Sequence, residues 1–93
     1  MIDKLNSVEA KYGELMQRLA DPAVQADPAQ YRTSAKALAE IEPLVEKFRE
    51  FKSVLTQIAQ SQELMESDPD MRELAQEELQ TLEARRDALD AEI

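Results

Sequence analysis

The chain has no cysteine, histidine or tryptophan, and it has only one glycine. The lack of cysteine excludes disulfides and thiolate metal sites. The lack of histidine removes the commonest general base and the usual nitrogen ligand of zinc. One glycine and one asparagine, Asn6, leave few residues for the positive-φ positions of β-hairpin turns. The composition therefore predicts neither a β-sheet nor a common type of catalytic centre.

Positive charge is also scarce, with 11 Lys and Arg against 20 Asp and Glu and a net charge of −9. A field of this sign repels phosphate and anionic lipid, so neither direct sequence-specific nucleic-acid binding nor membrane binding is expected. No apolar run approaches the roughly 20 residues of a membrane span, and the first residues do not resemble a signal peptide. We therefore expect a cytoplasmic location.

Apolar residues recur every three or four positions in three segments, which predicts helices at about 3–20, 28–65 and 69–93. Gly13 interrupts the first segment and the sequence does not explain it. The apolar stripes comprise Leu5, Val8, Tyr12, Leu15 and Leu19; then Tyr31, Leu38, Ile41, Val45, Phe48 and Leu55, with Leu44, Phe51, Ile58 and Met65 beside them; and finally Met71, Ala75, Leu79, Leu82, Leu89 and Ile93.

Asp-Pro pairs mark the boundaries between these segments, because Asp caps a helix and Pro suits its first turn. The pairs are Asp21-Pro22, Asp27-Pro28 and Asp68-Pro69. The first pair ends the first helix, and residues 23–26 are expected to form a connector. In the second, Gln30 occupies the position that completes a capping box. In the third, Ser67 or Asp68 is the expected cap.

Pro43 lies inside the middle segment and must either kink that helix or split it after Glu42. A kink is favoured because Ile41, Leu44 and Phe48 keep one helical phase across it. Short joints favour antiparallel neighbours. The expected fold is all-α: an elongated, antiparallel, coiled-coil-like assembly of three helices with a long middle helix. Because the apolar pattern runs to Ile93 without a stop signal, 1–93 is expected to be one helical domain of a longer protein.

The remaining groups that could carry chemistry are carboxylates, and no catalytic, cofactor-binding or metal-binding residue is expected. Several glutamates are close together in sequence but fit solvated helix faces better than a cation cage: Glu63, Glu66, Glu73, Glu77 and Glu78. The four aromatic residues, Tyr12, Tyr31, Phe48 and Phe51, are expected to pack in the core. Met16, beside the first stripe, is a candidate surface contact. The residues that bind a partner are not identifiable from these patterns.

Several runs in one order resemble the N-terminal domain of bacterial class I peptide chain release factors. They are Met1-Ile2-Asp3-Lys4-Leu5, Leu19-Ala20-Asp21-Pro22, Pro43-Leu44-Val45-Glu46-Lys47-Phe48-Arg49-Glu50-Phe51, and Asp68-Pro69-Asp70-Met71-Arg72-Glu73-Leu74-Ala75-Gln76-Glu77-Glu78-Leu79. The last run is more similar to the members that read UAA and UAG than to those that read UGA. The resemblance covers the whole chain, although each run alone is a weak motif.

The resemblance implies a part in translation termination. In that family the Gly-Gly-Gln and Pro-x-Thr-type tripeptides act from later domains, and neither tripeptide occurs in this sequence. The implied role is therefore docking to the ribosome through a protein at the large-subunit stalk base, and contact with the GTPase release factor, without catalysis.

Two other functions fit the residues alone. A helical chorismate-mutase-like enzyme would need clustered cations, and only Arg18, Arg32, Arg49 and Lys52 are loosely comparable. The net charge of −9 disfavours this reading. A self-associating coiled-coil protein, or a weak homodimer of this piece alone, would use the wide apolar face of the middle helix.

Overall fold

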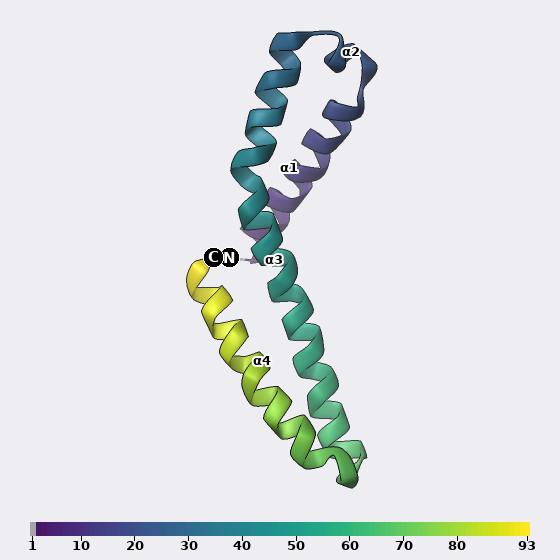
Figure 1. Ribbon diagram of the computed structural model, residues 1–93, viewed down its shortest axis with the longest axis vertical. Helices are drawn as coiled ribbons and strands as arrows, with labels where there is room; N and C mark the ends of the chain where they lie inside the picture. Colours follow the sequence, from purple (N-terminus) through teal and green to yellow (C-terminus); the bar gives the residue numbers. More distant parts are fainter. Residues whose placement is uncertain (1) are drawn as a thin grey trace. The chain divides into compact units, whose positions relative to one another are not determined.

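The computed structural model describes residues 2–93, which are helical throughout except at short joints and contain no strand. The elements are α1 (Ile2–Ala20), α2 (Pro22–Gln25), α3 (Pro28–Ser67), the 3-10 turn η1 (Pro69–Met71) and α4 (Arg72–Glu92) (Figure 1). The all-α class and the long middle helix are thus confirmed. The chain divides into two compact units, Met1–Glu46 and Lys47–Ile93, and α3 contributes to both.

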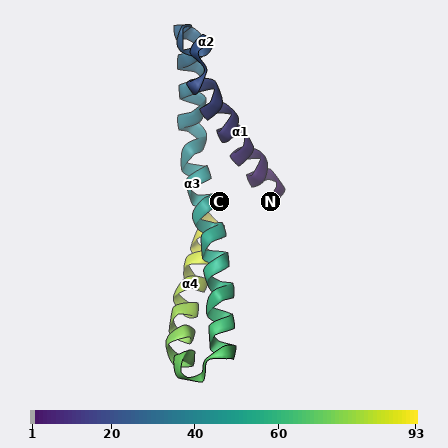
Figure 2. The same ribbon diagram turned by 90° about the vertical axis from the view of Figure 1, so that its right-hand side faces the viewer.

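In the first unit, α1 and the beginning of α3 run antiparallel and are joined through α2 (Figures 1 and 2). The expectation of an irregular connector at 23–26 was wrong, because Pro22–Gln25 is helical. Asp21 accepts a hydrogen bond from Ala23 N at 2.9 Å, and Pro22 occupies the first turn. These are the same start signals that begin α3, so they initiate a short helix here as well.

Asp27 caps α3, as predicted, by accepting hydrogen bonds from Ala29 N at 3.1 Å and Gln30 N at 3.3 Å. The expected capping box takes another form. Gln30 Nε2 donates to Asp27 Oδ2 at 3.0 Å, whereas the Asp27 backbone N–H donates to Val24 O at 3.0 Å. The amide that Gln30 would have capped is therefore already satisfied by the preceding turn.

Buried side chains of the first unit come from all three of its helices: Leu5, Leu15, Val24, Ser34 and Val45. Ser34 is 3% exposed, and its Oγ accepts a hydrogen bond from Arg18 Nε at 3.3 Å. This bond links α1 to α3 and satisfies a polar group at the contact. The prediction that Tyr31 packs in the core was wrong, since 43% of this residue is exposed.

The middle helix is not split at Pro43, because α3 is continuous from Pro28 to Ser67. Pro43 has no N–H, so the carbonyl of Ala39 lacks its helical donor at this point. Pro43 itself is exposed, where water can reach a freed carbonyl. Ile41 and Leu44 are half-buried on the two sides of Pro43, as the preserved apolar phase predicted.

In the second unit, the end of α3 and α4 form an antiparallel pair joined by η1 (Figure 2). Asp68 accepts a hydrogen bond from Asp70 N at 3.0 Å and so confirms the predicted cap, although it begins η1 and α4 starts only at Arg72. The buried residues are Phe48, Phe51, Val54, Ile58, Ser61, Ala75 and Leu89. Leu55 was wrongly expected on the packed stripe and is 38% exposed.

Candidate docking surfaces

No group of three or more His, Cys, Asp or Glu side chains among residues 2–93 is arranged to hold a metal ion. The glutamates that are close together in sequence all lie on exposed faces, as predicted: Glu63, Glu66, Glu73, Glu77 and Glu78. Carboxylates held in water by flexible side chains do not form the fixed oxygen cage that a hard cation requires.

Three of the four basic residues of the enzyme alternative, Arg18, Arg32 and Lys52, make contacts within their own units. Arg18 donates to Ser34 in the first unit, whereas Arg32 Nε makes a long hydrogen bond of 3.4 Å to Pro28 O in its own helix. In the second unit, Lys52 Nζ lies 4.5 Å from the centre of the Phe48 ring. Each of these three contacts lies within one helix or between two helices of the same unit.

The joint between α1 and α3 forms an exposed surface that we call the α2 tip. It consists of Pro22, Ala23, Gln25, Ala26, Pro28, Ala29, Gln30 and Tyr31, all of them exposed. The stretch 19–31 contains no Lys or Arg, and its two acidic residues, Asp21 and Asp27, both act as helix caps. In a chain with 33% charged residues, this is a charge-poor surface.

Hydrogen bonds hold the α2 tip in place. In addition to the two Asp caps, Gln25 Nε2 donates to Leu19 O at 2.9 Å, which ties α2 to the last turn of α1. Val24 is 6% exposed and anchors α2 in the first unit. Interface centres are depleted of charged residues and enriched in aromatic ones. The α2 tip, with Tyr31 at its edge, is therefore an ordered surface with the low charge that is typical of interface centres.

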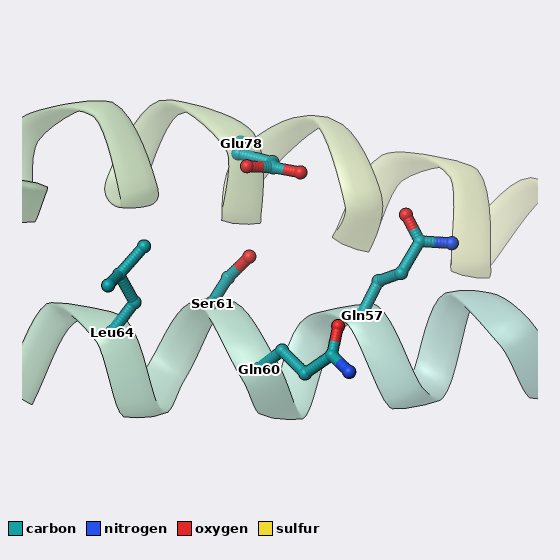
Figure 3. A pocket seen from close by; sticks show the side chains of 5 residues that line it. All are labelled: Gln57, Gln60, Ser61, Leu64 and Glu78. Carbon is teal, nitrogen blue, oxygen red and sulfur yellow. The ribbon is translucent and has the colours of Figure 1, made fainter.

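The second unit contains a groove of about 230 Å³ between α3 and α4. Its lining residues are Gln57, Gln60, Ser61 and Leu64 of α3 and Glu78 of α4 (Figure 3). Figure 3 shows the Ser61 hydroxyl pointing toward α4, with the Glu78 carboxylate lying across from it. Four of the five lining side chains are polar and none is cationic.

Two ion pairs join α3 and α4 in the second unit. Arg85 donates to Glu50 through Nε at 3.2 Å and Nη2 at 2.6 Å, and Lys47 Nζ lies 3.6 Å from Glu92 Oε2. The hydrogen bonds that Arg85 donates to the Glu50 carboxylate raise the pKa of the Arg85 guanidinium above its ordinary value, against a smaller opposing effect of desolvation. Because these side chains are well exposed, the two pairs contribute little to stability.

Sequence reasoning did not anticipate two features, the burial of Ser34 and Ser61 and the groove. Ser61 follows Ile58 by three residues and precedes Met65 by four, so it occupies a gap in the apolar stripe. That spacing was the available signal, because a polar residue in phase with a buried stripe faces the same neighbour as the stripe does. The exposure of Met16, which is 48%, agrees with its prediction as a surface residue.

Comparison with known proteins decides the family. The model of the PCRF domain matches residues 8–93. The chain belongs to the PCRF domain family. Peptide chain release factor 1 of Carboxydothermus hydrogenoformans is 41% identical to this PCRF-family chain, and that of Acidobacterium capsulatum is 40% identical, each over 100% of the chain and 26% of the relative. Peptide chain release factor 1 of Geobacter sulfurreducens is 39% identical with the same coverage.

The PCRF-family chain thus spans about a quarter of the length of these curated relatives. The family assignment confirms the resemblance to release factors seen in the sequence. No solved structure matched the chain. Within residues 2–93, no helix is both long enough and apolar enough to cross a membrane.

Proposed function

We propose that this chain is the N-terminal docking domain of a peptide chain release factor that acts in translation termination at UAA and UAG codons. The observation that carries the proposal is the similarity over 100% of the chain, at about 40% identity, to proteins named peptide chain release factor 1. The PCRF match over residues 8–93 supports the same function. The protein would act in the cytoplasm, on the ribosome.

Within such a factor this domain would contribute binding and not catalysis. It has no histidine or cysteine and lacks the Gly-Gly-Gln tripeptide. Its net charge of −9 opposes indiscriminate binding to rRNA, because phosphate and the domain surface repel each other. A protein is therefore the expected direct partner: a protein at the stalk base of the large subunit, with the GTPase release factor as a second partner.

The α2 tip is the surface best suited to that contact. It is exposed and charge-poor, and its backbone is fixed by Asp21 and Asp27. A fixed surface loses little conformational entropy on binding, so more of the contact energy remains as affinity. Tyr31 supplies an aromatic side chain, of the kind that contributes most to binding when it is buried by a partner.

The test uses the intact release factor with and without the residues corresponding to this chain. Deletion should leave peptide release measurable while weakening ribosome association and the response to the GTPase release factor. Unchanged binding and an unchanged response would refute the docking role.

A pair of point variants in the intact factor locates the contact. Tyr31→Ala should weaken ribosome association by about tenfold, which corresponds to about 1.4 kcal/mol. Leu55→Ala is the matched control, because Leu55 is also an exposed apolar residue of α3, at 38% against 43% for Tyr31. If both variants bind as well as the parent, the contact lies away from the α2 tip.

A further inference from the structure

The groove of the second unit is polar on most of its lining and carries one carboxylate and no cation. Gln57 Nε2 donates one of its two N–H groups to Ser53 Oγ at 3.2 Å, and its carbonyl oxygen can accept a hydrogen bond in the groove. Glu78 adds a carboxylate, which is acceptor-only when ionised. Glu78 forms no ion pair with any of residues 2–93. None of the residues that line the groove is cationic.

The buried hydroxyl of Ser61 is a second, independent indication that the groove binds a ligand. The residue is 6% exposed and its hydroxyl points toward α4 (Figure 3). Within residues 2–93, this hydroxyl has no hydrogen-bond partner. Every side-chain nitrogen or oxygen in that range that is completely enclosed does have a partner, so the Ser61 oxygen is not completely enclosed. The Ser61 oxygen must therefore open into the groove, where a bound group can reach it.

The size of the groove indicates more than a single water molecule. Its volume is about 230 Å³, whereas one water in the liquid occupies about 30 Å³. Acceptors come from two helices, so a ligand with several donors in different directions can reach more than one of them. A guanidinium group has five N–H donors in a planar fork and can bind a carboxylate through two parallel hydrogen bonds.

We propose that the groove between α3 and α4 binds the side chain of an arginine from a basic protein partner, with Glu78 as the counter-ion and Gln57 and Ser61 as additional acceptors. Charge complementarity favours a positively charged arginine side chain in this groove. The chain carries a net charge of −9. Glu77, next to Glu78, adds to the negative potential on the exposed face of α4. A lysine ammonium fits less well, because it is a point charge that cannot bind a carboxylate in bidentate fashion.

This site is separate from the α2 tip, which belongs to the other compact unit. The two proposals can therefore fail independently. Loss of ribosome docking in a Tyr31 variant would leave arginine binding unchanged, and the groove can be tested in the purified chain without a ribosome.

The experiment is an NMR titration of the ¹⁵N-labelled chain at 0.15 M salt with acetyl-Gly-Arg-Gly-amide. Matched peptides carry lysine or the neutral isostere citrulline in place of arginine. The arginine peptide should shift the amide signals of Gln57, Ser61, Leu64 and Glu78 and the side-chain NH₂ signals of Gln57 and Gln60. The citrulline peptide should leave them in place, and the lysine peptide should give smaller shifts.

Two variants and one control complete the test. Glu78→Gln should weaken binding of the arginine peptide by about threefold to fivefold, because an ion pair at an exposed carboxylate is partly screened by water. Ser61→Ala should weaken it by about threefold without changing the net charge. Glu77→Gln is the control, since it removes the same charge from the next position of α4, outside the groove lining.

Equal weakening by Glu78→Gln and Glu77→Gln would show that only the general surface charge attracts the peptide, and would overturn the proposal. The same conclusion follows if the citrulline peptide binds as well as the arginine peptide, or if the shifts lie outside the groove. Helix content by circular dichroism, measured for every variant, separates lost binding from lost folding.

Discussion

Leu89 is the most deeply buried residue of α4, so its substitution tests how that helix packs. It is 0% exposed, so Leu89→Ala removes three carbon atoms from a fully enclosed position of α4. The loss combines the transfer free energy of those atoms with the cavity left behind, and we expect the free energy of unfolding to fall by about 3 kcal/mol. For a chain of this size that corresponds to a fall in melting temperature of about 12–24 °C.

The assay is urea unfolding followed by circular dichroism, with amide hydrogen exchange over residues 72–92 to localise the effect. Leu74→Ala is the matched control, because it is the same substitution on the same helix at a residue that is 57% exposed. It should change the free energy of unfolding by no more than about 0.5 kcal/mol. If the two variants lose equal stability, Leu89 is not an enclosed residue and the buried face of α4 is wrongly identified.

Two substitutions in the helices should stabilise the chain. Gly13→Ala should raise the free energy of unfolding by about 0.5–1 kcal/mol, because a Cβ at Gly13 meets nothing within 4 Å and the glycine has no positive φ to preserve. Urea unfolding measures the change, and a destabilised variant would show that Gly13 is needed for contact with another molecule or chain segment. Pro43→Ala should raise the same free energy by about 1–3 kcal/mol, because it restores the N–H donor to Ala39 at an exposed position of a continuous helix. No gain in urea unfolding would mean that the carbonyl of Ala39 is already satisfied and that Pro43 costs α3 little.

The helix boundaries were predictable because their causes are local. Asp27 and Pro28 begin α3 through a side-chain cap and a fixed φ, and both effects depend on residues a few positions apart. The sequence prediction overlooked α2 although Asp21-Pro22 carries the same signal. A helix of four residues has almost no apolar periodicity to detect.

The candidate sites were less predictable. Tyr31 and Leu55 keep the phase of the apolar stripe but lie exposed, because a stripe shows which face of a helix is apolar and not where along the helix a neighbour covers it. Ser61 is buried for the opposite reason, since a neighbouring helix covers it despite its polarity. Its hydroxyl becomes part of a groove only because Glu78, 17 positions later, lies across from it.

The sequence by itself determined the all-α class, the helix starts at Asp-Pro pairs, the acidic surface and the family. These follow from nearest-neighbour backbone chemistry, summed charge and similarity to relatives. Only the tertiary structure decided which apolar residues are covered, that Arg18 would bond to Ser34 across two helices, and that acceptors from α3 and α4 would line one groove. The physical reason is that burial and convergence depend on pairs of residues far apart in the chain, whose positions no local rule specifies.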